Sequence, residues 1–285
     1  MHFAYSTNVF RSKPLAEAID AIAKAGFCAV EIIADRPHAF PDDLTAATIA
    51  ELGRCLAEKK IKICNLNSSL VTAMPEAYNP SWLEEDWQHR EMRIRYTLDC
   101  MRLAAALGVA YVSTNAGGQI PESMNQRDAF RLLVANLHRI LPLASKLGVK
   151  LLIEPEPGLL LETSEQALEL LKELEFNEYL GINFDAGHFF CVGEDPCQSW
   201  EKLKCYVAHV HLGDIPASRS HRHTQLGEGG VDIPAVLNCI EASEYGGYVT
   251  IRVDAYEQKP EDIVMASVNY LREKGFMPKR DNACS

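Results

Sequence analysis

The sequence predicts an α/β protein that folds as a single (β/α)8 TIM barrel. Short β-rich runs alternate with longer amphipathic runs along the chain, and strands that alternate with helices form parallel sheets. The length of 285 residues is close to that of one closed barrel. No Pro- or Ser-rich linker interrupts the pattern, so residues 1–285 are expected to form one domain.

The expected strands are short, mainly apolar runs. They cover residues 2–7, 29–33, 62–67, 109–114, 149–155, 179–185, 206–212 and 247–253. A doubly wound open sheet is the alternative, and it should carry a Gly-rich phosphate-binding turn after an early strand. The first turn, STNVFRSK, contains no glycine, which favours the closed barrel.

The expected helices are recognised by their ends. Pro14 lies in the first turn of the first helix, and Gly26 follows its last turn. Ser81 is expected to cap the third helix and Gly108 to end it, while Ser164 is expected to cap the fifth. The helices are expected at residues 14–26, 43–60, 81–107, 127–148, 164–174, a short stretch ending near 204, 232–246 and 260–275.

Composition limits the partners and the setting. The formal net charge of -11 disfavours binding to nucleic-acid backbones. No apolar run approaches the ~20 residues that span a bilayer, and the N-terminus does not read as a signal peptide. The 9 cysteines contain no CxxC pair, and Cys64, Cys100 and Cys239 lie on apolar faces. We therefore expect a reducing, cytoplasmic setting without disulfide bonds.

Polar residues gather where the expected strands end, which is the edge of a barrel that carries active sites. They are Asn115 after the fourth strand, Glu154 and Glu156 after the fifth, Asp185 and His188 after the sixth, His209 and His211 on the seventh, His221, His223 and Glu228 in the next loop, and Arg252 and Asp254 at the eighth.

A shared cation accounts for three of these groups. A desolvated carboxylate without a partner costs several kcal/mol, and one divalent metal held by Glu154, Asp185 and His211 would compensate two carboxylates at once. This donor set suits Mn, Zn, Fe or Co, and Mg if the histidine is not a ligand. Glu154 and Asp185 also have structural interpretations, as a salt-bridge partner and as a helix N-cap, and His209, on the same face as His211, is interpreted as a packed core side chain or a site residue.

Four segments resemble the xylose isomerase-like TIM barrels: IEPEP, FDAGH, HVHLGD and the H-x-H-x-x-x-GEG loop. This superfamily includes sugar and sugar-phosphate isomerases and epimerases, inosose dehydratases, hydroxypyruvate isomerases and endonuclease-IV-type repair enzymes. The resemblance is strongest in residues 151–254. It implies a metal held by Glu154, Asp185 and His211 and a substrate contact from His188. The loop histidine of the family matches His223, and His221 replaces an Asp.

The fourth metal position departs from the family pattern. The resemblance implies a Glu on strand eight within V-E-L or I-E-L, but this chain reads Ile251-Arg252-Val253-Asp254. Three arrangements are open. Asp254 reaches the metal from further along the strand, or the metal has three strand ligands with water or His223, or Arg252 supplies the positive charge in place of a metal.

The resemblance implies an isomerase or epimerase of a sugar, a sugar phosphate or a related polyhydroxy carbonyl compound. In such enzymes a metal polarises the carbonyl and a carboxylate removes the neighbouring proton. Glu154 is the expected base, with Glu156 as a second carboxylate and Asp254 in the place of the strand-eight Glu. The expected substrate-binding residues are His188, Arg252, Asn115 and Glu228. Arg252 is expected to hold a carboxylate or phosphate.

Other functions are open. A dehydratase or lyase on a similar substrate needs only one base, and the Glu-to-Arg change also favours a non-catalytic barrel that binds a small molecule. An endonuclease is disfavoured, because strands three and four end in Asn67 and Asn115 without the extra histidines of that branch. The expected partner is a small polyhydroxy substrate, and a homo-oligomer is left open.

Overall fold

Eight parallel strands close into a barrel in chain order, because β1 pairs with β2 on one side and with β8 on the other. This finding, from a computed structural model that describes residues 1–70, 79–254 and 259–277, confirms the predicted (β/α)8 barrel. The strands are β1 (His2–Ser6), β2 (Ala29–Ile33), β3 (Lys62–Asn67), β4 (Tyr111–Asn115), β5 (Lys150–Glu154), β6 (Leu180–Asp185), β7 (Val207–Leu212) and β8 (Tyr248–Ile251).

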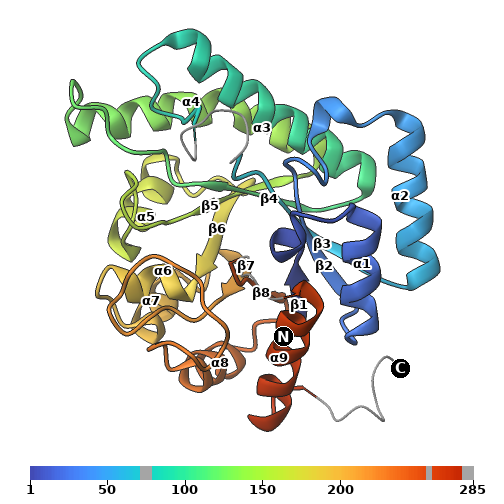
Figure 1. The fold of residues 1–285 in the computed structure, drawn as a ribbon. Helices are drawn as coiled ribbons and strands as arrows, with labels where there is room; N and C mark the ends of the chain where they lie inside the picture. Colours follow the sequence, from blue (N-terminus) through green and yellow to red (C-terminus); the bar gives the residue numbers. More distant parts are fainter. Residues whose placement is uncertain (71–78, 255–258, 278–285) are drawn as a thin grey trace.

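Helices follow the strands and surround the barrel (Figure 1). They are α1 (Leu15–Lys24), α2 (Ala46–Lys59), α3 (Trp87–Leu107), α4 (Gln126–Leu147), α5 (Ser164–Glu173), α6 (Ala186–Cys191), α7 (Pro196–Leu203), α8 (Ile233–Ala242) and α9 (Pro260–Glu273), with 3-10 turns η1 (Thr7–Phe10) and η2 (Pro41–Asp43). The long helices α3 and α4 pack together on one flank, and α9 packs beside α1 next to the closure of the barrel.

Two of the predicted N-caps are wrong. The helix expected from Ser81 begins at Trp87, where the Asp86 side chain accepts from the Gln88 N–H at 2.8 Å. Ser81 is instead buried in the preceding segment. The cap of α5 is Thr163 rather than Ser164, because Thr163 and Gln166 form a reciprocal capping box. Thr163 lies directly before Ser164 and takes the free N–H groups of α5, whereas α3 begins only at Trp87, and Ser81 Oγ accepts from the Leu83 N–H at 3.1 Å instead.

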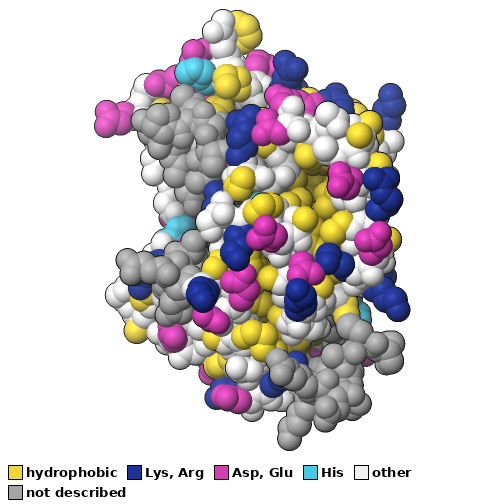
Figure 2. Space-filling model, turned by 45° about the vertical axis from the view of Figure 1, so that its right-hand side comes forward, with side chains coloured by type: hydrophobic (Ala, Val, Ile, Leu, Met, Phe, Trp, Pro, Cys, Tyr) yellow, Lys and Arg dark blue, Asp and Glu magenta, His cyan; other side chains and the backbone are white. Residues whose placement is uncertain are grey.

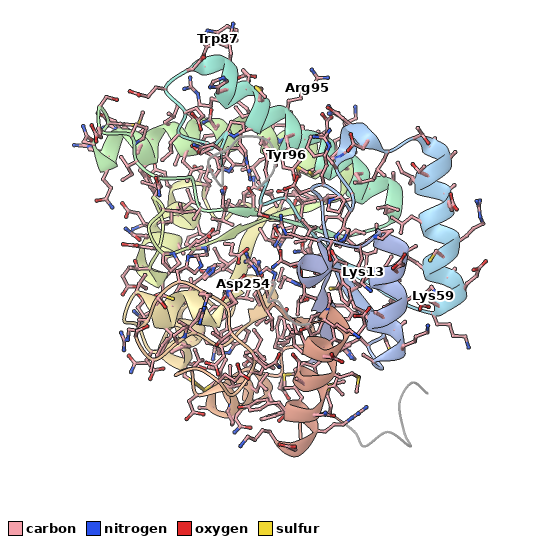
Figure 3. All side chains as sticks on the ribbon, in the orientation of Figure 1. Lys13, Lys59, Trp87, Arg95, Tyr96 and Asp254 are labelled. Carbon is pink, nitrogen blue, oxygen red and sulfur yellow. A yellow bond between two sulfur atoms is a disulfide. The ribbon has the colours of Figure 1, made fainter. Side chains whose placement is uncertain are left out.

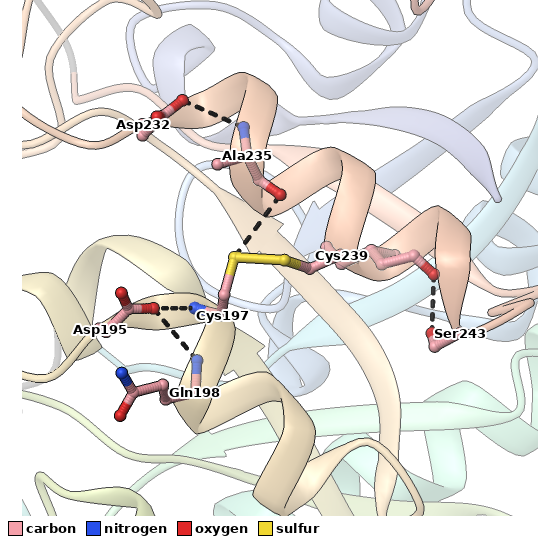
Figure 4. The surroundings of a disulfide bond; sticks show 8 residues. Asp195, Cys197, Gln198, Asp232, Ala235, Cys239 and Ser243 are labelled. Atoms are coloured by element: carbon pink, nitrogen blue, oxygen red, sulfur yellow. Dashed lines mark hydrogen bonds between the residues drawn. A yellow bond between two sulfur atoms is a disulfide. The ribbon is translucent and has the colours of Figure 1, made fainter.

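A disulfide joins α7 to α8 through Cys197 and Cys239 (Figure 4). The two Cα atoms lie 6.0 Å apart, although 42 residues separate them in the chain. The prediction that the chain lacks disulfides is therefore wrong, and Cys239 is more than a core filler. The sequence does not reveal this pair, because the packing of α7 against α8 brings together two cysteines that lie 42 residues apart.

The surface carries mixed charge. On the face in Figure 2, Lys and Arg side chains are interspersed with Asp and Glu, without one continuous basic area. Figure 3 shows Trp87 and Arg95 of α3 at the outer edge of the molecule, whereas Asp254 lies near its middle. Within the described ranges, no helix has both the length and the apolar character that crossing a bilayer requires.

The barrel interior is polar toward the carboxyl ends of its strands. Along each strand, successive side chains point alternately to the apolar outer face and to the interior of the barrel. On the inner face at this level lie Glu31, Asn65, Ser113, Asn183 and His209, all without exposed surface. Polar groups at this depth require partners, so this layer is the place to examine for chemistry.

Candidate metal and active site

Three side chains converge at the carboxyl ends of β5, β6 and β7. Glu154 and Asp185 are the last residues of their strands, and the β6–β7 register places His211 beside Asp185. All three are buried, and one ligand atom from each lies within 4.8 Å of the others. The structure thus brings together the three residues that the sequence singled out.

The imidazole of His211 lies between two carboxylates. Its Nδ1 is 2.9 Å from Glu154 Oε1, and its Nε2 is 2.6 Å from Glu31 Oε2. Burial would lower the pKa of His211, but the attraction of Glu31 and Glu154 outweighs it and raises the pKa to about 10. Without a cation, both ring nitrogens therefore carry protons at neutral pH, and the imidazolium balances part of the acidic charge.

Glu154 has three donors. Its Oε1 accepts from His211 and from Arg252 Nη1 at 3.0 Å, and its Oε2 accepts from Asn183 Nδ2 at 2.9 Å. Burial would raise the pKa of Glu154, but the charges of His211 and Arg252 hold it well below its ordinary value. The salt-bridge interpretation of Glu154 is thus confirmed, with Arg252 as the partner.

Asp185 uses its two oxygens differently. Oδ1 accepts the backbone N–H groups of Gly187 and His188, at 2.8 and 3.2 Å, and so caps α6. Oδ2 faces the interior and accepts from His223 Nε2 at 2.9 Å. Burial opposes ionisation, yet the hydrogen bond from His223 and the positive charge of His211 hold the pKa of Asp185 well below its ordinary value. The N-cap interpretation is confirmed, and Oδ2 remains directed at the candidate metal position.

Three histidines adjoin this group. His188 Nδ1 donates to the Pro155 carbonyl at 2.8 Å, which leaves its Nε2 to accept from His221 Nε2 at 3.0 Å. Burial lowers the pKa of His188 to about 3, so this ring is neutral. His221, by contrast, is partly open to solvent, and His223 is buried. The histidines extend the site from the strand ends toward solvent.

The strand-eight residues do not add an acidic ligand to the group. Arg252, just after β8, donates to Glu154. Asp254 Oδ2 accepts the backbone N–H of His223 at 2.9 Å, and the Asp254 N–H donates back to the His223 carbonyl at 3.0 Å. Asp254 therefore fastens the histidine loop, and within the described residues it does not belong to the three-ligand group.

The remaining predicted site residues lie at different depths. Glu156 is buried, with its Oε1 3.9 Å from His221 Nε2. Asn115 is the register partner of Glu154 on β4, and both polar atoms of its buried side chain lack hydrogen bonds to the residues that the structure describes. Glu228 is exposed on a turn of the loop, where its N–H donates to the Gln225 carbonyl.

Sequence reasoning missed the residues beneath the ligands. Glu31 was assigned to the second strand only, and Asn183 to the sixth, yet both contact His211. A signal was available, because a charged residue in the centre of the apolar run AVEII is unusual. Similarly, Asn183 lies two residues before Asp185 and so shares its face.

The donor set fits a divalent cation. Two carboxylates and an imidazole converge in a buried position, the arrangement in which Mn, Zn, Fe or Co is commonly held. Arg252 and the protonated His211 also supply positive charge there, so a cation would compete with them. Glu154, Asp185 and His211 could thus hold a metal with three protein ligands.

Residues 19–274 match the xylose isomerase-like TIM barrel family. Among curated proteins, the inosose dehydratase of Clostridium perfringens is 24% identical over 165 residues, covering 52% of this chain and 55% of the relative. The corresponding protein of Bacillus thuringiensis is 23% identical over 160 residues, or 50% and 53% of the two chains. The chain thus spans about half the length of the curated relatives that it matches.

Solved structures share the fold over nearly the whole chain. A D-tagatose 3-epimerase-like protein superimposes with a TM-score of 0.80 at 23% identity, covering 96% of this chain and 97% of that one. The IOLI protein with a bound zinc atom gives 0.79 at 18% identity, covering 96% and 98%. A family 2 AP endonuclease of Brucella melitensis gives 0.74 at 20% identity, covering 96% and 99%.

Proposed function

Because the chain belongs to the xylose isomerase-like TIM barrel family, we propose that it is a metal-dependent enzyme that isomerises or epimerises a sugar, a sugar phosphate or a related polyhydroxy carbonyl compound. The convergence of Glu154, Asp185 and His211 carries this proposal. Epimerase structures and a zinc-bound protein with the same barrel support it. In this proposal residues 1–285 act as one domain.

Glu154, Asp185 and His211 are the proposed metal ligands. When bound, a divalent cation supplies a Lewis-acid charge beside the substrate carbonyl and makes the neighbouring C–H more acidic. Asn115 lies on the neighbouring strand, and both polar atoms of its side chain have no hydrogen bond within the described part of the chain, which suits hydrogen bonds to substrate hydroxyls.

Glu156 is the proposed base. Glu154 is held by donors from His211, Arg252 and Asn183, which makes it a weak proton acceptor. Glu156 lies two residues further along the chain and is also buried, beside the solvent-facing His221. A positioned carboxylate base contributes about 10²–10⁴-fold to the rate of proton transfer. His221 and His188 are the groups proposed to exchange protons with substrate oxygens.

A dehydratase is the second candidate, and Arg252 favours it. Two-base epimerisation needs an acidic group on each side of the reacting carbon, and the strand-eight position holds a guanidinium instead. Dehydration needs one base to remove the C–H proton, while the neighbouring hydroxyl takes up a proton and leaves as water. The similarity to inosose dehydratases supports this alternative.

One experiment separates these activities. The protein, loaded in turn with Mn²⁺, Zn²⁺, Co²⁺ or Mg²⁺, is incubated in D₂O with ketohexoses, ketopentoses, their phosphates and inososes. Epimerisation or isomerisation introduces deuterium at carbon without loss of mass as water, whereas dehydration gives a product that lacks one water. Mass spectrometry with proton NMR distinguishes the two outcomes.

The result that contradicts the proposal is equally clear. A wild-type protein that binds none of these metals in calorimetry, or that binds metal and sugars without exchanging any proton, is not such an enzyme. Thermal stabilisation by a sugar without turnover would instead support the non-catalytic binding barrel. Glu156→Gln serves as the internal control and should abolish deuterium exchange while leaving metal binding unchanged.

A further inference from the structure

We propose that Glu31 is a positioning residue that orients His211 so that Nδ1 of the ring faces the metal. The inference rests on the proposed metal site and adds a residue to it. Glu31 Oε2 lies 2.6 Å from His211 Nε2, on the opposite side of the ring from Glu154 and Asp185. A carboxylate at that nitrogen accepts its N–H and leaves the other nitrogen for a cation.

The two sides of the His211 ring differ in their surroundings. Nδ1 lies 2.9 Å from Glu154 Oε1 and 3.8 Å from Asp185 Oδ2, which are the two carboxylates of the candidate metal group. Nε2 points toward β2, where Glu31 lies in the centre of the strand. The geometry thus separates a ligand side from a supporting side.

Glu31 is itself held in place. Asn65 Nδ2 on β3 donates to Glu31 Oε2 at 2.8 Å and to Ser113 Oγ on β4 at 2.8 Å. These hydrogen bonds link β4, β3, β2 and β7 in one layer below the ligands. His209 Nε2 approaches the same oxygen at 3.4 Å. A carboxylate supported in this way can fix the orientation of an imidazole.

A packing role alone does not account for Glu31. The residue has no exposed surface and interrupts the apolar strand AVEII, where a carboxylate costs several kcal/mol in desolvation. Among the residues that the structure describes, its side-chain partners are two imidazoles and one amide, without Lys or Arg. Carboxylates that accept from the outer N–H of a ligating histidine are the usual supporting partners of metal sites, and their loss typically weakens metal binding by about 10–100-fold.

The test measures Co²⁺ binding by calorimetry to the chelator-treated full chain. Glu31→Ala should weaken the affinity about 10–100-fold. Glu31→Gln retains an acceptor oxygen of the same reach and should recover most of that loss. Thr97→Ala removes a buried hydroxyl on α3, outside this layer, and is the control, which should bind Co²⁺ within about threefold of wild type. The Co²⁺ absorption spectrum should change in Glu31→Ala, because a tilted imidazole alters the ligand field.

A second measurement uses the wild-type protein, so the proposal stays testable if Glu31→Ala does not fold. In the Zn²⁺-loaded, ¹⁵N-histidine-labelled protein, the long-range ¹H–¹⁵N spectrum of His211 should show a protonated Nε2 and an unprotonated Nδ1. The reverse tautomer overturns the inference, as does a folded Glu31→Ala protein with wild-type Co²⁺ affinity. If the wild-type protein binds neither ion, the proposed metal site itself fails. If it binds both and only the Glu31 results disagree, this inference alone fails.

Discussion

Arg252 Nη1 donates to Glu154 Oε1 over 3.0 Å, at the strand-eight position where the family pattern has an acidic metal ligand. The guanidinium is mostly buried, and Glu154 is one of the three candidate ligands. The ion pair therefore neutralises a carboxylate that would otherwise bind a cation. The Arg252 charge also makes the carboxyl end of the barrel more positive than the family pattern implies.

Removal of the Arg252 charge should strengthen metal binding. In Arg252→Gln, Glu154 loses a competing donor, and a nearby positive charge no longer repels the cation, so we expect at least about tenfold tighter Zn²⁺ binding. Arg252→Glu should strengthen binding further, because it restores a fourth acidic group. Arg222→Gln removes an exposed positive charge from the neighbouring loop and is therefore the charge-matched control. Unchanged affinity in both Arg252 variants would show that the guanidinium does not compete.

The two roles of Asp185 should separate in Asp185→Asn. The amide oxygen can still accept from Gly187 and His188, and the His223 ring can take the tautomer whose Nε2 accepts from the new amide N–H, so the N-cap of α6 persists and stability should change by less than about 1 kcal/mol. Metal affinity should fall at least about tenfold, because a charged ligand is lost. Asp195→Asn on α7 is the matched control, since Asp195 caps its helix in the same way. Equal metal affinity in the two variants would remove Asp185 from the ligand set.

Asp214 should stabilise the loop that carries the histidines. Its Oδ1 accepts from Ile215 and Val231 and its Oδ2 from Gly227 and Gly229, at 2.9–3.0 Å, while the side chain is buried. In Asp214→Asn two of these N–H groups face an amide donor, and at about 1–3 kcal/mol each the unfolding free energy should fall by about 2–6 kcal/mol.

The control for Asp214 is Asp232→Asn at the start of α8. Asp232 accepts a single helix N–H, from Ala235 at 3.0 Å, and Asn is an equally good cap. Urea unfolding should show a loss below about 0.5 kcal/mol for this variant. Comparable losses in the two variants would contradict the special role of Asp214.

His38 should make the protein less stable in mild acid. Burial lowers the pKa of His38 below its ordinary value of 6.5, and the ring bonds Thr7 Oγ1 at 3.0 Å and the Phe10 carbonyl at 3.1 Å. Below pH 6.5 the unfolded chain takes up a proton on this side chain that the folded state does not, so stability falls as the pH falls.

The variant His38→Gln isolates this contribution. Its unfolding free energy should decline less than that of wild type between pH 7.5 and 5.5, when both are measured by urea unfolding. The exposed His138→Gln on α4 is the control. If the unfolding free energy of His38→Gln declined with pH as steeply as that of wild type, the acid sensitivity would belong to other groups.

Local sequence patterns predicted the barrel and the edge at which its polar groups meet. Alternation of strand and helix signals identified every strand, and the position of Glu154, Asp185 and His211 at strand ends brought them into one group. The predicted N-caps at Ser81 and Ser164 were wrong, because α3 begins only at Trp87 with Asp86 as its cap and because Thr163 caps α5 one residue before Ser164. The residue at which a helix begins depends on where the backbone turns, which periodicity does not specify.

The sequence by itself determined that eight strands would form one barrel and that acidic and imidazole side chains would end three of them. Strand periodicity is a local property of the chain, and a length of 285 residues suits one closed barrel. Only the tertiary structure decided that Glu31 holds His211, 180 residues away, and that Arg252 pairs with Glu154 across 98 residues. Barrel closure brings β2 within reach of β7, and β8 within reach of β5, across the interior at one depth, and that register is a property of the whole sheet. The partners of the buried charges follow from this register, as does the Cys197–Cys239 bond from the packing of α7 on α8.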